Sequence, residues 1–270
     1  TFQLNFKNSF SLCADIRSVE PEEFHKSLGD KVVDVVIGGP PCPTFSTIGH
    51  AKIQSENKKK GGCITEDPRN ILFMDYLKYV KYFKPKIFVM ENVPQFLTKY
   101  KGENFRQVKK IIERDLPEYQ LVDDVKVLNS VNYGVPQNRR RMILVGFLKK
   151  NSFNYPKITH WAKGARHNID PNNENIDPEA LQKHVSVNSA ISDLPNITDN
   201  WRVSEVKYSK HKGLDSYQKL MRENTSDSVS NNICRMSNER AKKVFSHMKQ
   251  GDIYMDLPKE VRRILPFRED

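Results

Sequence analysis

The sequence lacks the features that mark several common classes of protein. Its four cysteines, Cys13, Cys42, Cys63 and Cys234, form no close pair, so neither a zinc site nor a disulfide framework is indicated. No apolar stretch is long enough to span a membrane, no signal peptide is visible, and no internal repeat occurs. We therefore expect one or two ordinary domains that work in a reducing cytoplasm, with no metal and no membrane partner.

Acidic residues are also scarce relative to basic ones. The formal net charge is +11 and the isoelectric point is about 9.4. Most of the positive excess falls within the first 150 residues, where Lys58, Lys59 and Lys60 follow one another. Such a balance favours a polyanionic partner such as a nucleic acid. Because many lysine-rich proteins bind no nucleic acid, the charge supports this partner without proving it.

The most informative feature that is present is a cysteine between prolines. The run Gly38-Gly39-Pro40-Pro41-Cys42-Pro43 follows an apolar stretch, 32–37, that predicts a buried parallel strand. Ligands in open α/β sheets bind beyond the carboxyl ends of strands, so a thiol at this point is well placed for chemistry. A lone cysteine there is more often an inert core residue, and the choice between the two depends on the motifs that follow.

Two further strand ends supply polar groups. Glu91-Asn92-Val93 follows the apolar run 87–90, and Gln137-Asn138-Arg139-Arg140-Arg141 directly precedes the apolar run 142–147. Taken singly, the glutamate is typical of a helix-capping acid and the arginine run of a solvated surface. A thiol, a carboxylic acid and a guanidinium cluster at three strand ends, in this order, favour an active site instead.

Together these motifs resemble those of the cytosine carbon-5 DNA methyltransferase family. The order Pro-Cys, Glu-Asn-Val and Gln-x-Arg-x-Arg is typical of that family, and the segments 67–73 and 13–16 resemble two more of its sequence blocks. Asn70 stands where the family usually has glycine, which is a mild departure. The resemblance is specific between Phe6 and Leu148 and continues more loosely to Leu265.

The resemblance implies methyl transfer to carbon 5 of cytosine in a specific sequence of double-stranded DNA. Cys42 would be the nucleophile that adds to carbon 6 of a base flipped out of the duplex. Glu91 would bind ring nitrogen 3 and the exocyclic amine, and Arg141 would bind the base carbonyl and position Glu91. Arg139 would steady the catalytic loop or a phosphate, and Gln137 would support that turn against the DNA.

S-adenosylmethionine is the cofactor that the resemblance implies. Asp15 would accept a hydrogen bond from the adenine amine, and Ile16 would pack on the adenine ring. Pro41 and Leu72 would line the same pocket.

The polar segment 43–69 has no strong periodicity and predicts a mobile loop. The resemblance implies that such a loop closes over the DNA once the base is flipped. We expect Ser46 and the three lysines Lys58, Lys59 and Lys60 to contact the DNA from this loop, the lysines at phosphates.

Alternating apolar runs and helical stripes predict an α/β fold. We expect strands near 32–37, 87–90, 124–128 and 141–147 and helices around 72–83 and 103–112, in a doubly wound, Rossmann-like sheet. Residues 1–150 would form the catalytic domain, and residues 151–270 a connector and the start of a smaller target-recognition region. In the latter, the sequence predicts a turn-rich linker at 168–175, a short helix at 189–194, and a basic helix at 238–250 capped by Gly251.

The Phe-x-Gly-x-Gly loop that holds the methionine end of the cofactor in the family does not occur in this sequence. The family's last two blocks do not occur either. The resemblance therefore implies an excerpt of a longer bacterial or phage enzyme. Such an enzyme would belong to a restriction–modification system whose endonuclease acts separately.

Two alternatives stay open. One is an RNA cytosine-5 methyltransferase on the same scaffold, although the Cys-Phe-Thr element usual in the transfer-RNA branch is not found. The other is an inactive relative, or half of a split enzyme, that serves as a DNA-binding subunit. The missing glycine-rich loop favours this reading, while the intact set of Cys42, Glu91, Arg139 and Arg141 opposes it.

Overall fold

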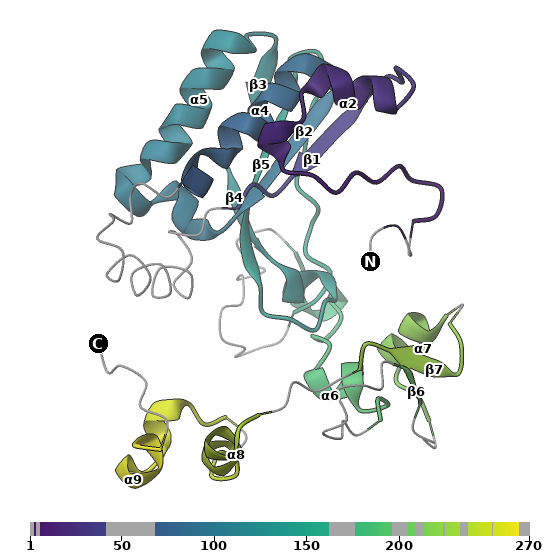
Figure 1. The fold of residues 1–270 in the computed structure, drawn as a ribbon, viewed down its shortest axis with the longest axis vertical. Helices are drawn as coiled ribbons and strands as arrows, with labels where there is room; N and C mark the ends of the chain where they lie inside the picture. The colour runs from purple at the N-terminus through teal and green to yellow at the C-terminus, as the bar shows by residue number, and fades with distance from the viewer. Residues whose placement is uncertain are drawn as a thin grey trace. The chain divides into compact units, whose positions relative to one another are not determined.

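The chain divides into two units, Thr1–His184 and Val185–Asp270, in a computed structural model (Figure 1). Each unit is described by itself below. The structure describes residues 3, 6–41, 68–161, 176–195, 205–208, 213–223, 225–232, 237–249 and 251–264. The predicted loop at 43–69 therefore falls, up to residue 67, outside the described residues, and so does the whole of the predicted linker at 168–175. Within the described ranges, no helix has both the length and the apolar character needed to cross a bilayer.

A five-stranded mixed sheet forms the centre of the first unit. Its strands are β1 (Val35–Gly38), β2 (Ile87–Asn92), β3 (Tyr119–Leu121), β4 (Lys126–Asn129) and β5 (Arg140–Leu148). The order is β1-β2-β5-β3, and β4 also pairs with β5. Only the β1–β2 pair is parallel, and the three pairs made by β5 are antiparallel. The parallel pair brings the carboxyl ends of β1 and β2 to the same edge, as the sequence predicted.

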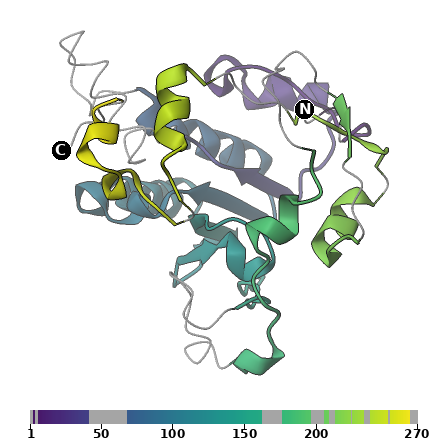
Figure 2. The same cartoon turned by 90° about the horizontal axis from the view of Figure 1, so that it is seen from below.

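Helices cover one face of this sheet. Among the described residues of the first unit, the α-helices are α2 (Pro21–Ser27), α4 (Leu72–Phe83) and α5 (Glu103–Asp115). The same residues include the short 3₁₀ turns η1 (Ile16–Ser18), η4 (Pro68–Ile71), η5 (Pro94–Leu97), η6 (Lys99–Gly102), η7 (Ser130–Tyr133) and η9 (Pro178–Ala180). Figures 1 and 2 show α4 and α5 lying along the strands, and α4 connects the parallel strands as a β–α–β unit requires. The predicted α/β class is confirmed.

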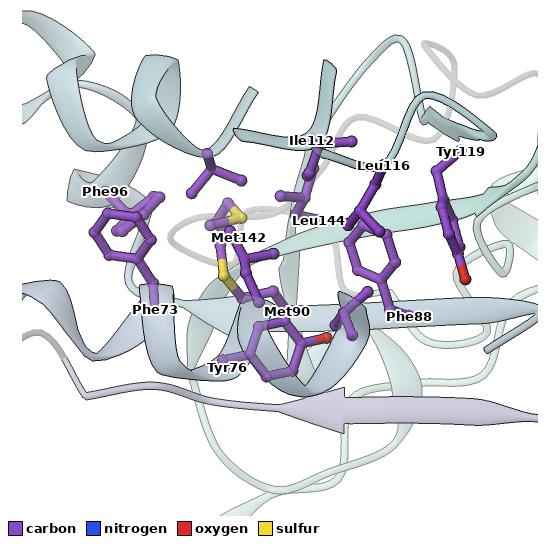
Figure 3. Packing of buried hydrophobic residues seen from close by; sticks show 13 residues of the cluster. Phe73, Tyr76, Phe88, Met90, Phe96, Ile112, Leu116, Tyr119, Met142 and Leu144 are labelled. Atoms are coloured by element: carbon purple, nitrogen blue, oxygen red, sulfur yellow. The ribbon is translucent and has the colours of Figure 1, made fainter. Parts of the chain in front are cut away.

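The main core lies between these two helices and the sheet. Apolar residues recur at helical spacing on α4 and α5, as the sequence predicted, and alternate residues of β2 and β5 meet them from the sheet. Figure 3 shows the packed side chains. The buried members are Phe73, Tyr76, Leu77, Val80, Phe88, Met90, Phe96, Val108, Ile112, Leu116, Tyr119, Met142 and Leu144.

The prediction that 32–37 is a buried strand is wrong in two respects, the start of the strand and its burial. The strand is parallel to β2, but it begins only at Val35, and Ile37 is 74% exposed. The reason is its position at the end of the strand order, where one edge pairs with β2 and one face meets the helix layer through Val36. An apolar run in the sequence indicates that burial of the strand is favourable. How far its side chains are buried depends on which other segments pack against the strand.

The described residues of the second unit form short elements. They are α6 (Val187–Ile191), β6 (Glu205–Lys207), α7 (Ser216–Arg222), β7 (Ser228–Ser230), α8 (Glu239–Phe245), η10 (Tyr254–Asp256) and α9 (Lys259–Arg262). Arg222 joins three of its parts, because its Nε lies 2.7 Å from Asp193 Oδ2 and its guanidinium lies 3.6 Å from the centre of the Tyr208 ring. A buried carboxylate paired in this way keeps its charge compensated.

Two helix boundaries in this unit differ from the prediction. The helix expected at 189–194 is α6, which begins after the cap Ser186 and ends at Ile191. The helix expected at 238–250 begins as predicted after Asn238, but it ends at Phe245, so Gly251 is not its cap. The Ser246 hydroxyl donates to the carbonyl of Lys243, and a ring nitrogen of His247 also contacts that oxygen. These local side-chain contacts compete with continuation of the helical ladder.

Candidate active site

The register of β2 against β5 brings a carboxylate and two guanidinium groups together. Glu91 is paired with Ile143, so Arg141, two residues earlier on β5, lies diagonally across on the same face of the sheet. Arg141 Nε is 2.6 Å from Glu91 Oε1, and Arg139 Nη2 is 3.4 Å from the same oxygen. The structure thus brings together three of the four predicted catalytic residues. Cys42 lies outside the described residues.

Glu91 is held firmly and remains accessible. Its side chain is 34% exposed, so solvent or a ligand can reach the carboxyl group. Both arginine contacts go to Oε1, which fixes the rotation of the carboxyl plane. The shorter contact, from Arg141, is a close ion pair, and the longer one, from Arg139, is also a hydrogen bond.

A hydrogen-bonded turn positions the two arginines. The backbone N–H of Ser130 donates to the Arg139 carbonyl at 3.1 Å, and the Ser130 hydroxyl donates to the Gln137 carbonyl at 2.5 Å. Asn129 Nδ2 donates to Asn138 Oδ1 at 2.9 Å. Gln137 therefore supports the turn through its backbone. Its expected approach to DNA stays a prediction.

Asn92 connects the end of β2 to the proline run. Alternation along β2 directs Glu91 to one face and Asn92 to the buried face, where Asn92 is 4% exposed. Its Nδ2 donates to the Pro40 carbonyl at 3.1 Å, and its Oδ1 accepts from the Val93 N–H at 2.8 Å. Pro40 is two residues before Cys42 in the chain. The buried amide of Asn92 thus ties the backbone at Pro40 to the end of β2.

Gly39 lies directly against the carboxylate. A Cβ atom placed on Gly39 would be 3.1 Å from Glu91 Oε2, closer than side chains normally pack. The glycine therefore allows the end of β1 to approach the end of β2 where Glu91 is held.

A cavity of about 250 Å³ opens beside this cluster. Glu91, Arg139 and Arg141 supply its charged wall, and Ser130 a hydroxyl group. The remaining wall is formed by Leu128, Tyr133, Ile143 and Pro156. A pocket with one charged corner and otherwise apolar walls suits a small planar polar ligand such as a nucleobase.

Three of the four predicted cofactor residues, Asp15, Ile16 and Leu72, lie at η1 and at the start of α4. Asp15 is the N-cap of η1, where it accepts from the Arg17 backbone N–H at 2.9 Å and from the Arg17 guanidinium at 3.0 and 2.6 Å. The side-chain hydrogen bond from Arg17 lowers the pKa of Asp15 to about 2. η1 packs near α4, whose first residue is Leu72.

These residues are compatible with an adenine ring. Asp15 is a solvent-facing carboxylate with acceptor capacity beyond the bonds from Arg17, and the neighbouring Ile16 is an exposed branched apolar side chain. Pro41 is exposed as well, at the edge of the described range. Within the described ranges, no group of three or more His, Cys, Asp or Glu side chains is arranged to hold a metal ion.

The DNA-contacting residues expected on the loop, Ser46, Lys58, Lys59 and Lys60, lie outside the described residues. The residues that sequence reasoning missed are Gly39, Asn92, Asn129 and Ser130. A signal existed for Asn92, because strand alternation next to Glu91 predicts a buried amide, and a buried amide needs hydrogen-bond partners. For the other three no local pattern gives the contact.

The sequence is similar to those of several known proteins. The sequence matches the family model for C-5 cytosine-specific DNA methylase over residues 1–268. It is 32% identical over 251 residues to type II methyltransferase M.DdeI of Desulfomicrobium norvegicum, covering 93% of this chain and 53% of that protein. It is 30% identical over 245 residues to type II methyltransferase M.Bpa9945I of Bacillus paralicheniformis, covering 85% of this chain and 50% of the relative.

A similar fold occurs in the crystal structure of a prophage-encoded protein described as a DNA modification methyltransferase (E. coli). The TM-score is 0.57 at 20% identity, over 90% of this chain and 64% of that one. This likeness supports the fold alone. The chain spans about half the length of the curated relatives described above. Because the family model matches nearly every residue, the chain belongs to the C-5 cytosine-specific DNA methylase family.

Proposed function

We propose that the protein of which this chain forms all or part methylates carbon 5 of cytosine in a specific sequence of double-stranded DNA. The observation that supports this most directly is Glu91, held by Arg141 and Arg139 beside the proline run that leads to Cys42. A carboxyl group oriented in this way next to an apolar-walled pocket is suited to a ring nitrogen and an exocyclic amine of a nucleobase.

Carbon 5 of cytosine is too poor a nucleophile to attack a methyl donor unaided. The enzyme must therefore supply a nucleophile of its own that activates the ring. The Cys42 thiolate adds to carbon 6, which makes carbon 5 enamine-like. Electron density moves toward ring nitrogen 3, where Glu91 donates a proton or a strong hydrogen bond. Once carbon 5 carries the methyl group, that carbon would lose its proton to a water molecule as the thiolate leaves carbon 6. Ring nitrogen 3 would return its proton to Glu91, which restores the aromatic base and the free enzyme.

The arginines act on Glu91 and on the base. Arg141 orients the Glu91 carboxyl group through Nε, and we propose that it also donates to the base carbonyl oxygen. Arg139 makes the longer contact and is the more exposed of the two, with 48% of its side chain exposed against 24% for Arg141. We assign Arg139 to steadying the catalytic loop or a phosphate, with Gln137 supporting its turn.

S-adenosylmethionine, when bound, supplies an electrophilic methyl group. Asp15 would accept from the adenine amine, Ile16 would cover one face of the ring, and Pro41 and Leu72 would line the pocket. An aspartate carboxylate is ionised across the physiological range and can serve as an acceptor there, and Arg17 lowers the pKa of Asp15 further, to about 2.

A duplex hides carbon 6 from any side chain, so the target base must leave the helix. We infer that Ser46, Lys58, Lys59 and Lys60 contact the DNA around it, the lysines at phosphates. Relatives named as type II methyltransferases support a place in a restriction–modification system. We propose that the protein acts there in the cytoplasm and that the endonuclease acts separately.

Trapping of the covalent intermediate tests this function. The full-length protein should form an adduct with duplex DNA that contains 5-fluorocytosine at the target, because fluorine blocks the final elimination. Cys42→Ser should form no adduct and transfer no methyl group while still binding DNA, since a hydroxyl is a far weaker nucleophile. Methylation by the serine variant, or methylation at a position other than carbon 5, would overturn the proposal.

A further inference from the structure

Tyr76 of α4 contacts both parallel strands with a single hydroxyl group. Its oxygen lies 2.9 Å from the carbonyl oxygen of Val89 on β2 and 3.2 Å from that of Val36 on β1. One hydroxyl proton is shared between two acceptors that belong to neighbouring strands. The side chain is 4% exposed, burial raises its pKa, and Figure 3 shows it among the packed side chains of the core.

Gly38 makes this arrangement possible. A Cβ atom on Gly38 would lie 2.5 Å from Cδ2 and 2.6 Å from Cε2 of the Tyr76 ring, so any other residue would displace the ring. The ring therefore lies directly on the last residue of β1, immediately before Gly39 and the proline run. Its hydroxyl is fixed by the same packing.

The two carbonyls lie just behind the two ends that form the candidate site. Val89 precedes Glu91 by two residues, and Val36 precedes Gly38 by two. The register pairs Ile37 with Val89, so the shared hydrogen bond spans the strands at one level of the sheet. A shift of β1 along β2 would lengthen one contact or the other.

We propose that Tyr76 is a positioning residue for the methyl-transfer reaction, whose hydroxyl fixes the stagger between the strand end bearing Glu91 and the strand end leading to Cys42. This inference rests on the proposed function. A phenylalanine would fill the same volume and keep the packing on Gly38, so the specific contribution of tyrosine is the link between strands. Active sites tolerate little misalignment of their reacting groups, since a 1 Å misplacement can lower the rate by about 100-fold. A hydrogen bond that holds the two strand ends in register therefore supports catalysis.

Two other tyrosines provide matched controls. Tyr79, also on α4, donates to the carbonyl of Val19, which lies outside the sheet. Tyr119 donates to the carbonyl of Pro85, which lies before β2, at the end far from Glu91. Each of these hydroxyl groups donates to a backbone carbonyl, so its removal costs a hydrogen bond comparable to that of Tyr76. Neither removal affects the hydrogen bond that links the ends of β1 and β2.

The test compares Tyr76→Phe, Tyr79→Phe and Tyr119→Phe in the full-length protein. We expect Tyr76→Phe to lower kcat and the rate of adduct formation with 5-fluorocytosine DNA by roughly tenfold. KM for DNA and for S-adenosylmethionine should stay within about twofold of the wild type, because no binding group is removed. The two control variants should retain the wild-type kcat even where they melt at a similarly lowered temperature.

Amide hydrogen exchange provides a second measurement that does not depend on activity. Tyr76→Phe should speed exchange at the ends of β1 and β2, around Gly38 and Glu91, while Tyr119→Phe should not. If exchange there is unchanged, or if kcat falls equally in all three variants, the positioning role is wrong. A wild-type protein that does not methylate carbon 5 would refute the proposed function instead, and the exchange result would still decide the structural role of Tyr76.

Discussion

Removal of the Asn92 amide should loosen the approach to Cys42 without unfolding the protein. Asn92→Ala deletes the bond to the Pro40 carbonyl at 3.1 Å and the bond from the Val93 N–H at 2.8 Å. Each buried hydrogen bond contributes about 0.5–1.5 kcal/mol net, so the two together contribute about 1–3 kcal/mol. A domain with a free energy of unfolding of about 5–15 kcal/mol stays folded after such a loss.

Stability and chemistry should respond to different degrees. For a unit of this size, a loss of about 2 kcal/mol should lower the melting temperature by about 4–8 °C. The rate of adduct formation with 5-fluorocytosine DNA should fall by about tenfold or more, because the chain before Cys42 is no longer tied to β2. Thermal unfolding and single-turnover trapping on the full-length protein measure the two effects separately.

Asn188→Ala is the matched control, since Asn188 is an exposed asparagine on α6. Its effect on the free energy of unfolding should stay within about 0.5 kcal/mol. Asn92→Asp adds a sharper comparison, because the acceptor for Val93 is kept while an oxygen replaces the donor that faces Pro40. The reasoning fails if Asn92→Ala melts like Asn188→Ala. It also fails if Asn92→Ala is destabilised but traps DNA at the wild-type rate.

Three further outcomes are expected. Glu91→Gln should slow turnover by roughly 100-fold while the melting temperature changes little, and a variant that unfolds would make Glu91 a structural residue. Arg17→Ala should raise the pKa of Asp15 from about 2 toward 3.8 in an NMR titration, because the variant lacks the cation that stabilises the carboxylate. As acid is added, Asp15 should therefore become protonated at a higher pH in the variant than in the wild type. An unchanged pKa would refute the pairing of Asp15 with Arg17. Replacing Lys58, Lys59 and Lys60 with alanine should weaken binding to cognate and random duplexes equally and reduce the log–log salt slope by about one unit per lost phosphate contact, whereas a changed target sequence would contradict the phosphate role.

The sequence predicted the elements of the first unit well because the relevant signals are local. Helical spacing identified α4 and α5, and apolar runs identified β2 and β5 together with the polar residues at their ends. The position of Glu91 at the carboxyl end of β2 follows from these signals alone. The family resemblance then named the same glutamate and arginines as partners.

What the sequence did not predict depends on contacts between distant segments. The exposure of Ile37 follows from the strand order, and the early end of α8 follows from side-chain contacts to the Lys243 carbonyl. The shared hydrogen bond of Tyr76 joins residues 13 and 40 positions away in sequence. Tyr76 has the spacing of an ordinary core residue, so nothing in the local pattern distinguishes its hydroxyl from a buried phenyl ring.

The period of two along β2 couples the core to the candidate chemistry. Met90 and Asn92 face the helix layer, where both are buried, and Glu91 between them faces the arginines. A slip of β2 by one residue would bury the carboxylate among apolar side chains and expose a methionine in its place. Both errors are costly, so the packing of Phe88 and Met90 beneath α4 and α5 selects the register that presents Glu91 to Arg141. In this protein the hydrophobic core therefore does more than stabilise the fold: it determines which face of the strand carries the carboxylate.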